Sequence, residues 1–114
     1  MPFICNRKNY TLINLKNIMF DHNIVNMVKS QNKLFPSELN NNIINNNSFP
    51  LNQKRLDRIL EGYYKGLPPI RVEEVIEKEL FIVFNGRHRI AATIIQEDSV
   101  IPVIIVKDNK IKNS

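Results

Sequence analysis

The sequence of 114 residues is poor in cysteine, glycine and tryptophan. Its one cysteine, Cys5, cannot form an internal disulfide, which also excludes a metal site built from several cysteines. No apolar run approaches the roughly 20 residues that a membrane-spanning helix needs, and the first apolar stretch is too short for a secretory signal. We therefore expect a protein of the cytoplasm, the nucleus or a host-cell interior that is neither secreted nor bound to a membrane.

Basic residues exceed acidic ones by 16 to 11, which gives a formal net charge of +5. This charge suits a polyanionic ligand such as a nucleotide or a nucleic acid, although an evenly solvated surface explains it equally well. The 17 asparagines, together with many lysines and isoleucines, indicate an AT-rich coding genome such as that of a virus or phage. The length is that of a single domain covering residues 1–114.

The N-terminal half contains signals for a strand, a helix and a loop. Apolar residues predict a strand over 10–15, and their spacing over 21–34 predicts a helix with Asp21 as its N-cap. The stretch at about 36–50 is bracketed by prolines and rich in asparagine, which indicates a low-complexity surface loop. We expect this loop to be a tolerated excursion from the domain and not a linker between two folded units.

The C-terminal half alternates helices and strands. Its predicted elements are a helix over 52–64, strands over 67–75 and 79–84, a helix over 87–97 and a strand over 101–106. The strand over 79–84 is almost unbroken apolar sequence, which predicts a buried position at the centre of the sheet. The charged tail from about 108 is expected to fray. The order β-α-α-β-β-α-β predicts an α+β fold in which a small mixed sheet packs with helices.

Three basic residues, Arg87, His88 and Arg89, follow directly after Gly86 at the start of the last predicted helix. The first turn of a helix carries unpaired N–H groups and the positive end of the dipole, so arginines there do not serve helix stability. A bound anion would resolve this conflict, because helix N-termini with nearby arginines are ready phosphate sites. Gly86 would permit a tight turn or a close approach of the backbone to a ligand.

The charges of this turn also have an explanation without a ligand. The arginines would then be exposed helix residues that pair with glutamates such as Glu73, Glu74 or Glu97, and such surface pairs contribute little to stability. A metal site built from protein side chains is not indicated. His22 is the only other histidine, and no carboxylate stands at a spacing that would complete a site.

The stretches GLPPIRV, ELFIVFNGRHRIAATIIQ and VIPVIIV together resemble the ParB/sulfiredoxin superfamily. The resemblance covers about residues 50–107. It consists of a helix, a PPI-containing strand, an apolar strand, a turn-helix with Gly, His, Arg and two alanines, and an IPV strand, in that order. It implies a nucleotide-binding domain like the N-terminal domain of ParB, in which Gly86, His88 and Arg89, with the helix N-terminus, bind the phosphates. Arg87 is a further candidate for phosphate binding.

The resemblance further implies that the preceding helix faces these phosphates, with Lys54, Arg55 and Arg58 at positions where the family presents phosphate-contacting side chains. Two departures limit what carries over. Arg87 stands where sulfiredoxins have their reactive cysteine, so thiol chemistry of that kind is not expected. The stretch GRHRIAA also lacks the glutamate of the arginine-rich turn found in ParB partition proteins.

The main functional hypothesis is a nucleotide-binding domain that holds ATP or CTP with Mg²⁺ and hydrolyses it or transfers a phosphoryl group. It would act in a nucleic-acid-related process or as an accessory protein of a virus or phage. Catalysis would depend on positioning and on charge stabilisation by the arginines and the helix N-terminus. The candidate catalytic residues are Glu61, Glu73, Glu74 and His88, among which the sequence does not choose.

Two alternatives stay open. The same residues could bind a phosphodiester in a nuclease or phosphodiesterase, although no acidic pair has a clear two-metal spacing. The domain could also be a module without catalysis that binds DNA or a protein. The arrangement of the basic residues discriminates between these functions. A concave pocket would favour a nucleotide, and a flat basic face would favour a polynucleotide.

Overall fold

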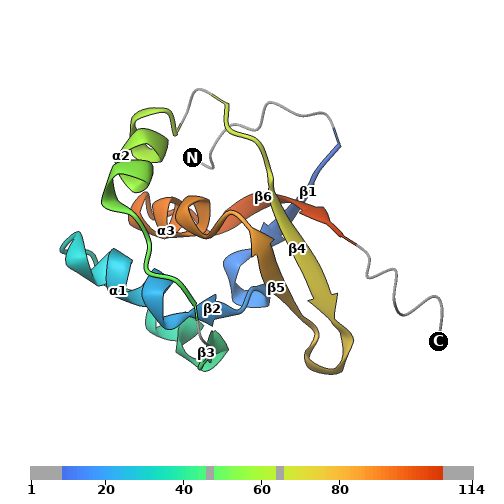
Figure 1. The fold of residues 1–114 in the computed structure, drawn as a ribbon. Helices are drawn as coiled ribbons and strands as arrows, with labels where there is room; N and C mark the ends of the chain where they lie inside the picture. The colour runs from blue at the N-terminus through green and yellow to red at the C-terminus, as the bar shows by residue number, and fades with distance from the viewer. Residues whose placement is uncertain (1–8, 46–47, 64–65, 107–114) are drawn as a thin grey trace.

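The computed structural model describes residues 9–45, 48–63 and 66–106, so Cys5 and the tail from about 108 lie outside the described residues. Within these ranges the chain forms an α+β domain in which three α-helices pack with a mixed four-stranded sheet (Figure 1). The helices and strands are β1 (Thr11–Asn14), β2 (Phe20–Asp21), α1 (His22–Ser30), β3 (Ile43–Ile44), α2 (Gln53–Glu61), β4 (Ile70–Val75), β5 (Leu80–Asn85), α3 (Arg87–Ile95) and β6 (Val100–Ile105). No helix in these ranges is long and apolar enough to cross a membrane.

The sheet has the strand order β1-β6-β4-β5. β6 pairs antiparallel with β1 and parallel with β4, while β4 and β5 form an antiparallel hairpin. The predicted buried strand over 101–106 is confirmed, because β6 lies between two neighbours and Ile101, Pro102 and Val103 are buried. β2 and β3 form a separate parallel pair.

The hydrophobic core is centred on α3. Figure 1 shows the helices together beside the sheet, with α3 between α1 and α2. Every residue from Ile90 to Ile95 is buried, because α3 contacts other elements all around its circumference. Ile90, Ala91, Ile94 and Ile95 therefore point inward. Ile70 and Val72 of β4 belong to the same core.

Polar side chains cap the starts of α1 and α2, as predicted for Asp21. Asp21 accepts hydrogen bonds from the backbone N–H groups of Asn23 and Ile24, and Asn52 accepts one from Arg55. These bonds satisfy donors that the first turn of each helix leaves unpaired. The helix ends are less well predicted, since α1 ends at Ser30 and not near residue 34.

The prediction that residues 79–84 form a central strand is wrong, because β5 is the edge strand of the sheet. None of its residues is fully buried, and the side chain of Phe84 is 66% exposed. Phe81 and Val83 pack against the core, which explains part of the apolar run. The outer edge is covered in part by the chain before β2, where the Met19 N–H donates to the Phe81 carbonyl at 2.9 Å.

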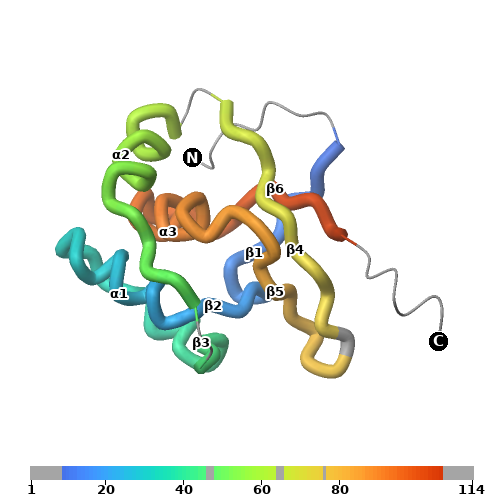
Figure 2. Tube along the Cα trace, viewed as in Figure 1, coloured from blue at the N-terminus to red at the C-terminus, as the bar shows by residue number. Residues whose placement is uncertain are grey.

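Within the stretch 36–50, residues 37–44 are more structured than the surface loop that the composition predicts. Residues Ser37–Asn42 form a 3-10 helix whose Leu39 is only 2% exposed, and β3 follows directly. One leucine and two isoleucines among the asparagines supply the apolar contacts that order this segment. Figure 2 shows the chain from residue 48 passing the starts of α1 and α3 on its way to α2.

Candidate functional site

The turn between β5 and α3 requires a glycine. Gly86 has φ 116° and ψ 29°, a left-handed conformation that residues with a Cβ rarely adopt. A Cβ at this position would also collide with the buried Ile70 side chain, lying 2.7 Å from its Cβ and closer still to its Cγ2. Gly86 has no side chain to cap α3, so the first N–H groups of the helix remain open to a ligand.

Arg87 points away from α2 and links the first turn of α3 to two segments of the N-terminal half, at Asp21 and at Phe49. Its Nε and Nη2 donate to the two carboxylate oxygens of Asp21 at 2.6 and 3.0 Å, and Nη2 also donates to the Phe49 carbonyl at 2.6 Å. The Asp21 side chain is only 7% exposed. Burial alone would raise the pKa of Asp21, but the bonds from Arg87 and the Ile24 N–H outweigh it and hold this pKa below its ordinary value.

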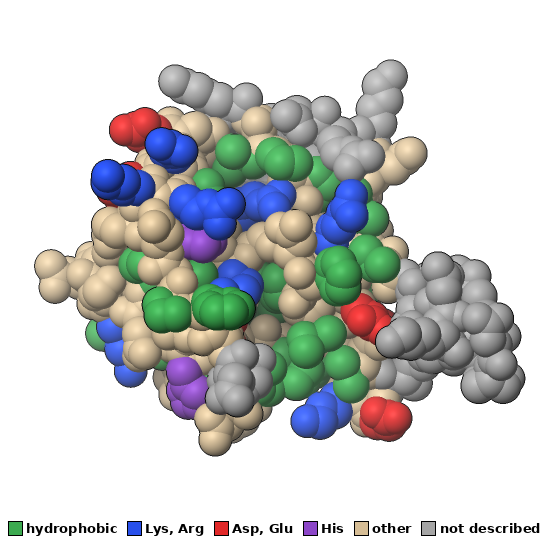
Figure 3. Space-filling view, in the orientation of Figure 1, with side chains coloured by type: hydrophobic (Ala, Val, Ile, Leu, Met, Phe, Trp, Pro, Cys, Tyr) green, Lys and Arg blue, Asp and Glu red, His purple; other side chains and the backbone are tan. Residues whose placement is uncertain are grey.

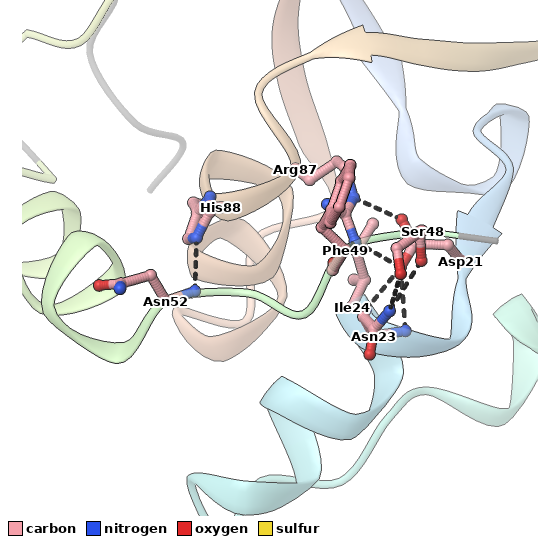
Figure 4. A network of polar contacts seen from close by, with 8 residues as sticks. All are labelled: Asp21, Asn23, Ile24, Ser48, Phe49, Asn52, Arg87 and His88. Carbon is pink, nitrogen blue, oxygen red and sulfur yellow. Dashed lines mark hydrogen bonds and ion pairs between the residues drawn. The ribbon is translucent and has the colours of Figure 1, made fainter.

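His88 points the opposite way, toward the start of α2 (Figure 4). Its Nε2 accepts a hydrogen bond from the Asn52 N–H at 2.8 Å, so the neutral ring carries its proton on Nδ1. Burial, followed by the positive charges of Arg55, Arg87 and Arg89, lowers the pKa of His88 below its ordinary value. His88 therefore presents a neutral ring with one N–H donor near neutral pH.

Arg89 binds the chain that leads into β4. Its Nη1 donates to the carbonyls of Pro68 and Pro69 at 2.7 and 3.1 Å, and its Nη2 donates to Asn85 Oδ1 at 3.3 Å. Burial lowers the pKa of Arg89, although a guanidinium stays charged at any pH at which the fold is stable. The arginines of this turn thus pair with Asp21 and with carbonyl and amide oxygens, and not with Glu73, Glu74 or Glu97.

A hollow of about 160 Å³ lies between α2 and the first turn of α3, and we call it the α3 hollow. Its lining residues are Arg55, Ile59, Asn85, Gly86, Arg87, His88 and Arg89. Among the residues that the structure describes, no carboxylate lines it. Figure 3 shows Lys and Arg side chains gathered around a histidine on this face. The geometry and the charge therefore suit a small anion.

The predicted phosphate-binding residues divide into two groups. Five of them line the α3 hollow: Arg55, Gly86, Arg87, His88 and Arg89. Lys54 and Arg58 are exposed on α2 and do not line it. The side chain of Arg55 is exposed and has no hydrogen-bond or ion-pair partner among the described residues, which leaves its guanidinium available to a ligand.

Three of the predicted catalytic candidates do not line the hollow. Glu61 is the last residue of α2, and Glu73 and Glu74 lie along β4 opposite Ile82 and Phe81 of β5. His88 does line the hollow, but its Nε2 is engaged by Asn52. Within the described part of the chain, no three His, Cys, Asp or Glu side chains are grouped so as to hold a metal ion.

Sequence reasoning missed two residues of this network. Asp21 was expected only to cap α1, whereas it also pairs with Arg87, 66 positions away. Ser48 lies in the asparagine-rich stretch, and both its hydroxyl and its carbonyl accept from the Asn23 side chain, at 2.8 and 3.0 Å. No local pattern indicates either contact, because each joins segments that are distant along the chain.

The sequence matches no protein-family model and no curated protein. Solved structures do share its fold. A conserved hypothetical protein from Pyrococcus furiosus aligns with a TM-score of 0.57 at 14% identity, over 94% of this chain and 35% of that protein. A free serine kinase in complex with AMP aligns with a TM-score of 0.56 at 14% identity, over 93% of this chain and 34% of the kinase. The chain spans about a third of the length of each, and it shares with both a small α+β fold.

Proposed function

We propose that this domain binds the phosphate groups of a nucleotide in the α3 hollow. The observation that carries the proposal is the lining of this hollow, in which three arginines and a neutral histidine meet the open N-terminus of a helix and no described carboxylate opposes them. An anion there would accept hydrogen bonds from the first N–H groups of α3 and would interact favourably with the helix dipole.

Two side chains are free to contact the phosphates directly. The Arg55 guanidinium has no partner among the described residues, and the His88 ring has its Nδ1–H donor unused there. Arg87 and Arg89 would contribute mainly positive potential, since most of their donors are engaged in the fold. This division supports a site that is preorganised before the ligand arrives.

The proposed ligand class is supported by two comparisons. The turn-helix and strand motifs resemble the ParB/sulfiredoxin superfamily, and the fold is similar to that of a serine kinase in complex with AMP. Both support membership of that superfamily and binding of a nucleotide such as ATP or CTP. Mg²⁺ would then be held largely by the phosphates and water, since the described residues contain no acidic cluster to ligate it.

Phosphoryl transfer is a second candidate function, and the likeness to a kinase is the observation that favours it. Such a reaction would depend on positioning and charge stabilisation at the α3 hollow, because none of the candidate glutamates lines it. Polynucleotide binding is favoured less. Of the five Lys and Arg side chains of α2 and the first turn of α3, three line one hollow, while Lys54 and Arg58 lie outside it.

The test is calorimetric titration with ATP, CTP, GTP and UTP, with and without Mg²⁺, on the wild type and two matched variants. Arg55→Ala removes a lining arginine that has no structural partner, and Arg58→Ala removes an exposed arginine of the same helix that does not line the hollow. We expect Arg55→Ala to weaken binding about tenfold or more, and Arg58→Ala to change it little. Absence of binding by every nucleotide, or equal effects of the two variants, would overturn the proposal.

A further inference from the structure

A second hollow of about 220 Å³ lies on the other side of Arg87. We call it the strap hollow, after the segment of residues 48–52 that borders it and that we call the strap. Its walls are mainly apolar and include Ile44 of β3 with Ile82 and Val83 of β5. Phe49 and Ser48 also line it. Arg87 lines both hollows, so the two are neighbours across the first turn of α3.

The strap, residues 48–52, connects the two hollows. Three sets of hydrogen bonds hold it: Asn23 donates to Ser48, Arg87 donates to the Phe49 carbonyl, and the Asn52 N–H donates to His88 (Figure 4). The backbone is therefore anchored at both ends and in between. The Phe49 side chain is nevertheless 84% exposed. A large aromatic side chain on a firmly held backbone, left open to solvent at the rim of a hollow, is well placed to receive a flat ligand.

We propose that the strap hollow receives the base of the nucleotide whose phosphates occupy the α3 hollow, with Phe49 stacked on the base. This inference rests on the proposed function. A nucleobase has apolar faces, which match the isoleucine and valine walls and the Phe49 ring. Every base offers such a face, so stacking on an aromatic side chain depends little on which base is bound.

The dimensions agree with one ligand that spans both hollows. Phe49 is three residues from Asn52, whose N–H binds the His88 ring, so the two positions are at most about 10 Å apart along an extended chain. That is the scale on which a nucleotide separates its base from its outer phosphates. Neither hollow alone reaches the roughly 300 Å³ at which small-molecule pockets begin, whereas the two together do.

The polar groups of the strap hollow are already engaged with one another. Asp21 pairs with Arg87, and the Ser48 hydroxyl accepts from Asn23. Few donors or acceptors therefore remain to read the edge of a base, and the binding energy at this hollow comes from stacking and apolar contact. Removing the Phe49 ring is accordingly the most informative single change.

The experiment compares ATP with tripolyphosphate, which carries the same phosphates without a base, on wild type, Phe49→Ala, Phe49→Trp and Phe84→Ala. Phe84 is also an exposed phenylalanine but lines neither hollow, so it is the matched control. We expect wild type to bind ATP more tightly than tripolyphosphate. Phe49→Ala should weaken ATP binding about five- to hundredfold and leave tripolyphosphate binding unchanged. Phe49→Trp should retain the preference for ATP, and Phe84→Ala should behave as wild type.

Two different failures can be told apart. If wild type binds tripolyphosphate and ATP equally, or if Phe49→Ala keeps the preference for ATP, the base does not lie on Phe49 and this inference alone is overturned. If neither ligand binds, the phosphate site itself is overturned, and the inference falls with it. Loss of folding does not complicate the result, because a side chain that is 84% exposed contributes little to stability.

Discussion

Arg87 and Asp21 form a bidentate ion pair that joins the first turn of α3 to the N-cap of α1, with N–O distances of 2.6 and 3.0 Å. The carboxylate is nearly buried and caps α1 at the same time. An arginine that the sequence assigns to a ligand therefore has a structural partner 66 positions away. Its positive charge still contributes to the potential of the α3 hollow, which it lines.

Removing Arg87 should destabilise the fold. Arg87→Ala leaves the Asp21 carboxylate buried without its counter-ion, and we expect the free energy of unfolding to fall by about 3 kcal/mol. In the double variant Asp21→Asn/Arg87→Ala the asparagine can still cap α1, and the loss should be smaller than the sum of the single losses. Urea denaturation of wild type, Arg87→Ala, Asp21→Asn and the double variant measures this coupling. Strict additivity would show that the two side chains do not interact in solution.

Removing Arg89 should also cost stability. Arg89→Ala leaves the Pro68 and Pro69 carbonyls without their donor, and a loss of about 1–3 kcal/mol is expected from the unmade hydrogen bonds. Arg58→Ala, which removes an exposed arginine, should stay within about 0.5 kcal/mol of wild type. Chemical denaturation curves of both variants provide the comparison. Equal midpoints for the two would mean that the Arg89 contacts do not contribute.

Gly86→Ala should be strongly destabilising. The new Cβ meets a left-handed backbone and the buried Ile70 side chain together, and we expect a loss of about 2–5 kcal/mol. Gly62→Ala is the matched control, because a Cβ there meets only the Arg58 carbonyl oxygen at 3.7 Å and the backbone has φ −99°. In thermal unfolding, the melting temperature should decrease strongly for Gly86→Ala and change little for Gly62→Ala. Similar melting temperatures would refute the requirement for glycine at the turn.

The lowered pKa of His88 predicts a pH dependence of stability. The folded state resists protonation of this ring, so the unfolded chain binds more protons once the pH falls below the ordinary histidine pKa of about 6.5. His88 therefore makes its full contribution to the free energy of unfolding above the ordinary histidine pKa. This contribution is lost as the pH decreases through the lowered pKa of the folded state. Unfolding free energies at several pH values between 7.5 and 5 measure this loss.

His88→Gln is the informative variant for this titration, because the amide oxygen can still accept from the Asn52 N–H but does not take up a proton. Its stability should decrease less than that of wild type over the same pH range. If the stability of His88→Gln decreased as much as that of wild type, another group would be responsible for the pH dependence.

The sequence predicted most elements of the fold because their signals are local. Asp21 and Asn52 cap helices within three residues of themselves, and the Gly86 turn lies between an apolar strand and a helical pattern. The edge position of β5 was not predictable, because apolar residues on an edge strand covered by another segment resemble those of a central strand. Strand order depends on pairing between distant residues, which one sequence does not report.

The candidate site was predictable to a similar extent. The basic turn indicated an anion site, and Arg55, His88 and Arg89 do line one hollow. The sequence could not reveal that most donors of Arg87 and Arg89 are engaged in the fold, since their acceptors are carbonyls and a carboxylate at least 20 positions away, apart from Asn85. The charge of a side chain can be read from sequence, but its availability to a ligand cannot.

The way the strap is held has a consequence for engineering. Its anchors at positions 49 and 52 are the backbone carbonyl and the backbone N–H, not the side chains. The Phe49 side chain can therefore be exchanged without loosening the strap. The contacts that fix the geometry of this segment are thus separate from the side chain that it presents to solvent, and residue 49 is a position at which the side chain can be varied on a constant backbone.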